Sequence, residues 1–381
     1  MKKLRVLHIG NGNAFKIKAI VRFFRDRGHE MHFIPTPPVD ERWDGIIYHN
    51  LPSFGRFSKF QVLKNIYTIR HIAAKVQPDI IHAHTAGGPG WYGAFCRHHP
   101  YVIHGYGSDL LPYHYGVKNI FSKMLTMYAC KKADRIVVTG EHMVDASSHL
   151  GIPNHKFKVL PRGVDLKVFK PGLNTEGLKN KLNINNSSPV IFSPRYQLEE
   201  TYYNFDTIIK SIPHIKKLHP DVLFIQLYGE GREKEKKELE VMALNLGVSK
   251  NYKMINAVGN EEMPFFYNLA DAVVSVPSTD GFPVTVLEAS ACGVPMVVTN
   301  LDFTAEWFKN DQNGILIPVR DSLALSKAVL KLLDNQEMRH RIIVKNREQV
   351  EEKADYGKCM LELEKLYYEL LTNSDSYVIT N

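Results

Sequence analysis

The chain has 381 residues, of which 44% are hydrophobic and 23% charged, a globular composition that excludes a disordered chain. At roughly 100–200 residues per domain, this length predicts two domains. The formal net charge is +8, from 48 Lys and Arg against 40 Asp and Glu. No stretch approaches the roughly 18 apolar residues of a membrane-spanning helix, and none of the 4 cysteines forms a Cys-x-x-Cys pair. We therefore expect a cytoplasmic protein in a reducing compartment.

The charge is divided unevenly between the two halves. Residues 1–165 contain 23 Lys and Arg and 11 Asp and Glu, a net of +12, whereas residues 166–381 contain 25 and 29, a net of −4. A basic half favours an anionic partner, which could be a phosphorylated substrate, an anionic membrane surface or nucleic acid. The alternative is a solvated basic surface that serves solubility.

Short apolar runs alternate with amphipathic stretches along the whole chain. In the first half we predict strands at 4–9, 31–34, 79–84, 101–103, 135–139 and 158–160, and helices at 15–27, 56–76 and 118–132. In the second half we predict strands at 190–193, 222–228, 252–255, 272–276, 296–299 and 314–317, and helices at 205–218, 233–246, 262–270, 284–291, 323–333 and 351–371. This alternation predicts parallel βαβ units, hence an α/β fold with two doubly wound domains.

A connector rich in Pro, Gly and Asn begins at Pro161-Arg162-Gly163-Val164-Asp165 and runs to Ser188. We therefore predict an N-terminal Rossmann-like domain at 1–165 and a C-terminal one at 166–381. Ligands of open α/β sheets bind beyond the carboxyl ends of the strands, so the two domains should hold a ligand in a cleft between them.

The most informative segment runs from Ser278 to Pro295, where a strand ends, a loop with Gly281 follows and a helix opens near Pro283. The free N–H groups and the positive end of a helix make an anion site. Asp280 lies just before that site and Glu288 lies eight positions later, so one acid could hold sugar hydroxyls and the other a ribose. The alternative is an Asp that caps the helix and a Glu on the helix surface.

This segment resembles the acid-x7-acid motif of GT-B fold, retaining glycosyltransferases of the GT4 type. Other segments resemble further motifs of that family, in the family's order: Asp79-Ile80-Ile81-His82-Ala83-His84, His104-Gly105-Tyr106-Gly107-Ser108-Asp109, Pro161-Arg162-Gly163-Val164-Asp165, Tyr228-Gly229-Glu230-Gly231, Gly293-Val294-Pro295 and Asn313-Gly314. Each motif is short, but the series extends over almost the whole chain.

The resemblance implies transfer of a sugar from a UDP- or GDP-sugar to an acceptor hydroxyl with retention of anomeric configuration (EC 2.4). It implies an acceptor-binding first domain, a donor-binding second domain and a terminal helix that packs back on the first. The implied catalytic residues are His104 and Asp280, and Asp109 is a weaker acceptor-side candidate. The implied donor-binding residues are Arg195, Glu288, Gly12, Gly281, Phe282, Pro283, Val284, Thr285 and Val258. No cofactor and no metal are expected, because Arg195 and the helix dipole can stabilise the departing diphosphate.

Two positions depart from the family pattern. Arg195 stands where an arginine is usual, but the lysine expected about five residues later is absent, since the chain reads Glu199-Glu200-Thr201. The helix near Pro283 must then contribute more of the stabilisation, or another cation must enter. Asp280 replaces the more usual glutamate and is one methylene shorter, so contacts to sugar hydroxyls can differ.

His82 and His84 stand two apart on a predicted strand and so face one side. A zinc site would need further ligands, which the sequence does not reveal, so a structural role is the better interpretation. The glycines at 87, 88 and 90 are predicted to form a tight loop after that strand.

Aromatic and cationic residues interleave at 54–60 and 15–27, as in segments that bind anionic membranes. A lipid-linked acceptor or cell-surface glycan precursor would bring the first domain to the inner face of the plasma membrane, which would make this a peripheral enzyme of polysaccharide biosynthesis. A solvated helix face is the alternative. Two other functions stay open: a different GT-B enzyme, such as a sugar-nucleotide epimerase or a phosphorylase, and a basic nucleic-acid-binding protein, for which no recognised motif appears.

Overall fold

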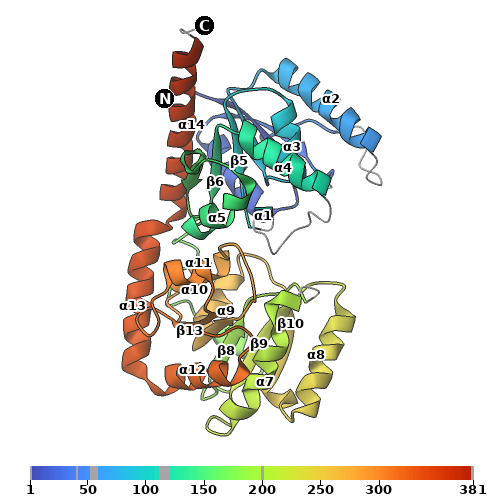
Figure 1. The fold of residues 1–381 in the computed structure, drawn as a ribbon. Coiled ribbons are helices and arrows are strands. Elements are labelled where there is room, and N and C mark those ends of the chain that lie inside the picture. Colours follow the sequence, from blue (N-terminus) through green and yellow to red (C-terminus); the bar gives the residue numbers. More distant parts are fainter. Residues whose placement is uncertain are drawn as a thin grey trace. The chain divides into compact units, whose positions relative to one another are not determined.

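The computed structural model describes residues 2–39, 42–51, 59–107, 109–110, 120–198 and 201–378. The chain divides into two compact units, one of Met1–Pro161 with Lys358–Asn381 and one of Arg162–Gly357. Each unit is a parallel sheet with helices packed on it, as the alternation of elements predicted (Figure 1). No helix in the described part of the chain is both long and apolar enough to span a membrane.

The sheet of the first unit has seven parallel strands in the order β3-β2-β1-β4-β5-β6-β7. Their bounds are β1 Arg5–Gly10, β2 Glu30–Pro35, β3 Ile47–Tyr48, β4 Ile80–His84, β5 Tyr101–His104, β6 Arg135–Val138 and β7 Phe157–Val159. Six of them were predicted to within about two residues. The sequence analysis missed β3, because a strand of two residues leaves no periodic pattern.

The helices of the first unit are α1 Phe15–Asp26, α2 Lys59–Val76, α3 Gly88–Phe95, α4 Ile120–Lys132, α5 Glu141–Ala146 and α14 Tyr356–Val378. The predicted tight loop at residues 87–90 is wrong, because Gly88 and Gly90 belong to α3. A Cβ at Gly93 would lie 2.4 Å from the ring of Tyr101. The glycines therefore allow α3 to pack directly on the sheet. In the sequence alone, the same glycines suggested a turn.

The predicted helix at 351–371 corresponds to α14, except that its first three residues belong to the end of α13 Gln336–Lys353; the two helices are separated at Ala354 and Asp355. Only α14 joins the first unit. Glu364 accepts hydrogen bonds from Arg27 at 3.0 Å and meets the ring of His29 at 2.7 Å, and Tyr367 stacks on Phe24. A buried carboxylate and a buried aromatic ring thus fix the last helix to α1 and to the loop before β2.

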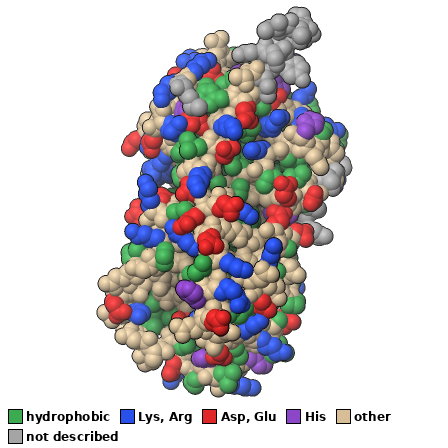
Figure 2. Space-filling model, turned by 90° about the vertical axis from the view of Figure 1, so that its left-hand side faces the viewer, with side chains coloured by type: hydrophobic (Ala, Val, Ile, Leu, Met, Phe, Trp, Pro, Cys, Tyr) green, Lys and Arg blue, Asp and Glu red, His purple; other side chains and the backbone are tan. Residues whose placement is uncertain are grey.

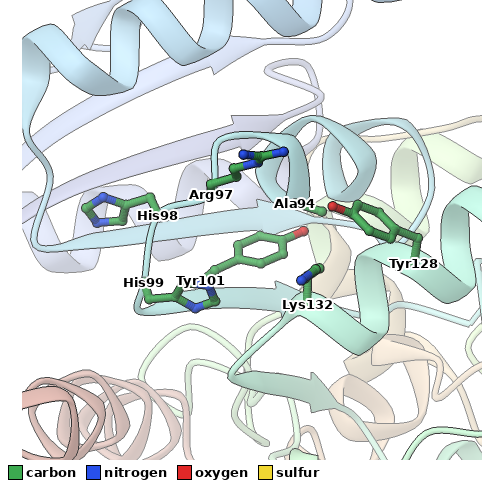
Figure 3. Close-up of a pocket in the computed structure, with 7 residues that line it drawn as sticks. All are labelled: Ala94, Arg97, His98, His99, Tyr101, Tyr128 and Lys132. Atoms are coloured by element: carbon green, nitrogen blue, oxygen red, sulfur yellow. The ribbon is translucent and has the colours of Figure 1, made fainter. Parts of the chain in front are cut away.

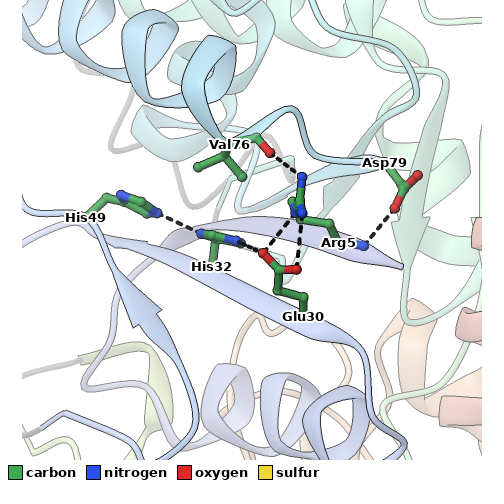
Figure 4. Close-up of polar contacts among 6 residues, drawn as sticks. All are labelled: Arg5, Glu30, His32, His49, Val76 and Asp79. Carbon is green, nitrogen blue, oxygen red and sulfur yellow. Dashed lines mark hydrogen bonds and ion pairs between the residues drawn. The ribbon is translucent and has the colours of Figure 1, made fainter. Parts of the chain in front are cut away.

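A polar network lies at the amino-terminal ends of strands β1, β2 and β4 (Figure 4). Oε1 of Glu30 accepts a hydrogen bond of 2.8 Å from Nε of Arg5 and lies 2.8 Å from Nε2 of His32. Nδ1 of His32 in turn lies 2.8 Å from Nε2 of His49. The backbone N–H of Arg5 donates to Asp79 at 2.7 Å. Because these side chains satisfy one another, the network ties the starts of β1, β2 and β4 together.

The second unit has six parallel strands in the order β10-β9-β8-β11-β12-β13. The strands are β8 Val190–Ser193, β9 Leu223–Tyr228, β10 Tyr252–Asn256, β11 Ala272–Ser275, β12 Met296–Thr299 and β13 Ile315–Ile317. The helices are α6 Glu176–Leu182, α7 Phe205–Lys216, α8 Glu233–Asn245, α9 Met263–Leu269, α10 Val284–Ala291, α11 Asp302–Trp307, α12 Ser322–Asp334 and α13. All six strands were predicted. The short helices α6 and α11 were missed, and so was nearly all of the 18-residue α13.

Alternating residues of the second sheet enter different cores. Phe192 of β8 belongs to one buried cluster and its neighbour Ile191 to another, and the same division separates Val273 from Val274 in β11. The sheet is therefore covered on both faces, which explains its unbroken apolar strands. In both units the order of the strands reverses beside the first strand, at β1/β4 and at β8/β11. Such a reversal is where α/β sheets bind ligands.

Candidate functional site

A predicted donor-binding residue, Arg195, and a predicted catalytic residue, Asp280, meet at the reversal point of the second sheet. Arg195 follows β8 by two residues and Asp280 follows β11, the strand beside it. Their side chains form an ion pair through a guanidinium nitrogen and a carboxylate oxygen, and both are largely buried. The sequence analysis placed both residues in the donor site but did not foresee that they pair with each other.

The Arg195 side chain is held on several sides. Its Nε lies 3.4 Å from the hydroxyl of Ser275, and the guanidinium stands 4.8 Å above the ring of Tyr203. Burial is the largest single influence and disfavours its charge, but the charge and hydrogen bond of Asp280, together with Tyr203 and Tyr267, outweigh it, and the pKa of Arg195 is raised. A cation that is fixed, buried and charged at any accessible pH is suited to bind a diphosphate. Asp280 does not cap α10, whose N-cap is Pro283, so that alternative is wrong.

Glu288 lies within α10 and is buried, so the alternative of a helix-surface glutamate is also wrong. Its Oε2 accepts a hydrogen bond of 2.7 Å from the hydroxyl of Tyr267 in α9. Burial raises the pKa of Glu288, while the bond from Tyr267 and the charges of Arg162 and Arg195 oppose the rise. The sequence analysis missed Tyr267 and Arg162 as partners, because both are distant along the chain.

The loop before α10 and the first residues of that helix contain five more of the predicted donor residues, at positions 281–285. Gly281, Phe282 and Pro283 are buried, and Phe282 meets Trp307 edge-on with ring centroids 5.3 Å apart. Pro283 supplies no side-chain cap to the helix. The hydroxyl oxygen of Thr285 is buried and has no hydrogen-bond partner among the described residues. The helix therefore begins without a side-chain cap and with an unused hydroxyl, which are features that suit an anion site.

Val258 lies in the loop after β10 and packs against the core that contains β8 and α10. Glu199 and Glu200, which occupy the position of the missing lysine, lie outside the described residues. Whether another cation replaces the lysine therefore stays an open prediction.

In the first unit, His104 ends β5 and is buried among other rings. It stacks on His82 at 5.6 Å and on Tyr106 at 4.6 Å between centroids. His84 lies beside His104 in the register of β4 and β5. These rings lie at the carboxyl end of the first sheet, beside its own reversal point.

The carboxylate of Asp109, the predicted acceptor-side residue, accepts hydrogen bonds from backbone N–H groups in this structure. One carboxylate oxygen accepts from the N–H of Ala86 at 2.7 Å, and the other from Tyr106 at 3.0 Å and Gly107 at 3.1 Å. Asp109 thus ties the loops after β4 and β5 together, as a side chain that accepts several N–H bonds commonly does. Acceptor binding by Asp109 stays a prediction.

Gly12 follows β1 and is needed for packing. A Cβ at this position would lie 2.3 Å from Val39 and 3.2 Å from the ring of Phe33. Val39 therefore packs closely against the backbone at Gly12, and contact of Gly12 with the donor stays a prediction.

A pocket of about 330 Å³ opens at the start of β5, at the edge of the first sheet opposite to His104 (Figure 3). Arg97 and Lys132 line it together with Tyr101 and Tyr128. The helices α3 and α4 end beside it, so its cations lie where they complement the negative ends of the helix dipoles. None of the predicted site residues lines this pocket.

Comparison with known proteins identifies the family of this chain. The model of the family "Glycosyltransferase Family 4" matches residues 16–168, and that of "Glycosyl transferases group 1" matches residues 174–349. The chain belongs to these glycosyltransferases. It is therefore an enzyme of the GT4 type, with the GT-B fold that the motifs implied.

Relatives and solved structures extend over most of the chain. An uncharacterized glycosyltransferase of Methanocaldococcus jannaschii is 24% identical over 94% of this chain and 95% of its own length. The UDP-Gal:alpha-D-GlcNAc-diphosphoundecaprenol alpha-1,3-galactosyltransferase of Escherichia coli is 24% identical over 88% and 87%. The crystal structure of HepE of Anabaena, in complex with UDP and glucose, superposes with a TM-score of 0.80 at 17% identity, covering 96% of this chain and 100% of that one. That likeness establishes the common fold.

Proposed function

We propose that this glycosyltransferase moves a sugar from a UDP- or GDP-sugar to an acceptor hydroxyl with retention of anomeric configuration. The observation that carries the proposal is the buried Arg195 beside the open start of α10, at the reversal point of the second sheet. Arg195 and the N–H groups of α10 would hold the diphosphate and stabilise its charge as it departs, without a metal. The solved relative with UDP and glucose bound has the same fold.

The two acids of the site take different roles in this proposal. Glu288 would accept the ribose hydroxyls, and Asp280 would exchange its bond to Arg195 for bonds to sugar hydroxyls when the donor binds. Neither is placed as a covalent nucleophile, because Asp280 is paired with a cation and Glu288 is held by Tyr267. This arrangement supports attack from the face of the leaving phosphate, with the phosphate helping to take the acceptor proton. His104 is proposed to bind the transferred sugar from the first unit.

A donor panel tests the proposal. UDP- and GDP-sugars would be screened for stabilisation of the protein, and the product's anomeric configuration would be read by NMR. Arg195→Ala should weaken the diphosphate interaction and lower kcat/KM by at least tenfold, since charge-assisted bonds are worth roughly 1.5–3 kcal/mol. His104→Asn should lower kcat while leaving binding of UDP or GDP alone unchanged. Inverted product, or full activity of Arg195→Ala, would contradict the mechanism.

For the acceptor we propose a lipid-linked or cell-surface glycan precursor, presented at a membrane. The E. coli relative is named for a diphosphoundecaprenol acceptor. Helices α2 and α4 of the first unit contain seven Lys and Arg and no Asp or Glu, and α3 packs against both of them (Figure 1). Large apolar side chains stand out from these helices, with exposed fractions of 64%, 76%, 57% and 62% for Leu63, Tyr67, Phe121 and Met124.

Cations beside exposed apolar side chains are what interfacial binding to anionic lipid requires. The predicted segment at 54–60 lies outside the described residues, so α2 and α4 now carry this part of the proposal. By contrast, basic and acidic side chains are mixed across the surface drawn in Figure 2. Nucleic-acid binding stays the less favoured alternative, because neither the site nor the comparisons support it.

Sedimentation with vesicles tests the membrane proposal. Protein should bind vesicles that contain anionic lipid at low salt and dissociate as salt rises. Tyr67→Ser should weaken binding, whereas Leu244→Ser, which removes an apolar side chain of 66% exposure from the second unit, should not. Equal binding by both variants, or no binding by the wild type, would contradict the membrane proposal and would leave the proposed donor site unaffected.

A further inference from the structure

Three histidines meet inside the first unit at the reversal point of its sheet. His8 of β1 lies directly beside His82 of β4 in the strand register, and His84 follows two residues later on the same face. All three side chains are buried. One ring nitrogen from each lies within 4.8 Å of the others, and in the described part of the chain this is the one group of three or more candidate metal ligands.

The nitrogen positions suit a common central atom. His8 Nδ1 and His84 Nε2 are 3.0 Å apart, whereas two nitrogens bound to one tetrahedral zinc stand about 3.4 Å apart. The remaining distances would need each nitrogen to move by less than about 1 Å, which ring rotation can supply. A direct hydrogen bond between His8 and His84 is the competing explanation of the 3.0 Å contact.

Outer partners orient two of the rings. His82 Nδ1 lies 2.5 Å from the hydroxyl of Tyr367, and His84 Nδ1 lies 2.9 Å from that of Tyr106. With each Nδ1–H donated to its tyrosine, both Nε2 atoms keep a free lone pair, which is how protein partners prepare metal-binding histidines. The Nε2 of His82 is buried and has no hydrogen-bond partner among the described residues. Leaving such an atom unsatisfied costs about 1–3 kcal/mol.

The chemistry of the ligands indicates the class of metal, since all three are buried histidine rings. A set of neutral imidazoles selects zinc, copper, nickel or cobalt over magnesium or calcium, which prefer oxygen ligands.

We propose that His8, His82 and His84 bind one divalent transition-metal ion, zinc being the best match, within the first unit. This site is separate from the donor site, where no metal is invoked, and the proposal stands whether or not the proposed donor and acceptor are correct. From the sequence alone a structural role was the better interpretation of His82 and His84, because no further zinc ligand could be identified. The third ligand comes from β1, 74 residues before His82 in the sequence, and only the sheet brings it close.

The wild-type protein decides the matter first. Untagged protein would be stripped with a chelator, dialysed against zinc and analysed by elemental mass spectrometry. We expect one equivalent of zinc, a higher unfolding temperature as zinc is added, and a visible absorption spectrum of tetrahedral type when cobalt replaces it. Zinc content well below one equivalent in the wild type overturns the proposal, and the cluster is then a set of hydrogen-bonded rings.

Variants assign the ligands. His84→Asn and His8→Asn should each lose the zinc and the cobalt spectrum. The matched control is His49→Asn, because His49 pairs with His32 at 2.8 Å and stacks on it but has no third histidine in that group (Figure 4). Retention of zinc by His84→Asn and its loss from His49→Asn would refute the assignment.

A charge variant gives a result that does not depend on removing a ligand. The ammonium of Lys16 lies 3.6 Å above the ring of Tyr106 and its charge acts on His84. A neighbouring positive charge repels a metal cation. Lys16→Met should therefore bind zinc more tightly than the wild type, as measured by competition with a chromophoric chelator. Unchanged or weaker affinity would place the metal away from this cluster and count against the proposal.

Discussion

The bond between Tyr267 and Glu288 offers the sharpest test of the donor site. Tyr267→Phe removes only the hydroxyl that donates to Glu288 at 2.7 Å, and it leaves a ring of the same shape in the core. Both residues are buried, so water does not replace the lost donor. Hydrogen bonds to charged groups contribute roughly 1.5–3 kcal/mol. We expect the free energy of unfolding at pH 7 to fall by about that amount.

The same substitution should change the pH dependence of activity. Burial raises the pKa of Glu288 and the Tyr267 hydroxyl lowers it, so loss of the hydroxyl should raise the pKa further. Glu288 must be ionised to accept two ribose hydroxyls, and the ionised fraction falls as the pH drops through its pKa. The acidic limb of kcat/KM for the donor should therefore move to higher pH, while the limb for Glu288→Gln should disappear.

A double-mutant cycle separates the bond from other effects. In the Glu288→Gln background the carboxylate is absent, so Tyr267→Phe should cost less there than in the wild type. Unfolding by urea gives the stabilities, and initial rates over a range of pH give the profiles. If Tyr267→Phe left both the stability and the acidic limb unchanged, Glu288 would not be the buried, tyrosine-held acid on which the donor site is built.

Three further outcomes follow from the packing. Glu364→Gln should lower stability on the order of 2 kcal/mol near neutral pH. Burial opposes ionisation of Glu364, but its bonds to Arg27 and His29 lower its pKa. The stabilisation is therefore present above the unfolded pKa near 4.5 and is lost as the pH falls through the lower folded pKa. Urea unfolding should show a smaller stability difference between the variant and the wild type at pH 4 than at pH 7. Gly12→Ala should cost about 1–3 kcal/mol through overpacking and be rescued by Val39→Ala, as thermal unfolding would show. Burial raises the pKa of the Cys130 and Cys292 thiols to about 12, so alkylation of these thiols should be much slower in the native protein than in the unfolded chain. Rapid labelling of the native protein would contradict their burial.

Periodicity predicted the elements of this fold well wherever burial imposes a regular pattern. The strands β8 and β12 begin and end at the predicted residues, because each is a short apolar run that ends in a hydroxyl residue and is bounded by proline or asparagine. The two-residue β3 and the six-residue α11 were missed because neither completes two periods. The glycines of α3 were assigned to a turn, since their contact with Tyr101 depends on packing that one sequence does not display.

The candidate site shows the same division between local and tertiary information. Arg195, Asp280 and Glu288 could be placed at strand ends and on one helix because their neighbours in sequence define those elements. Their partners could not be placed. Asp280 meets Arg195 across 85 positions of the chain and Glu288 meets Tyr267 across 21. Both contacts arise from the order of strands and helices around the sheet, which the motifs do not specify.

The repeated strand order also explains why two different chemistries arise from one topology. In each unit the first strand lies between the second and the fourth, so the loops that follow the first and fourth strands diverge and leave their ends exposed to a ligand. At β8 and β11 those ends present a cation and two acids, which suit a nucleotide-sugar. At β1 and β4 they present neutral, buried imidazoles, which have no charge to offer a diphosphate but have lone pairs for a metal. Under the proposed function, the net charges of +12 and −4 would not decide where the anionic donor binds. A single buried arginine within the acidic half would do so more effectively, because its charge is desolvated and fixed in place.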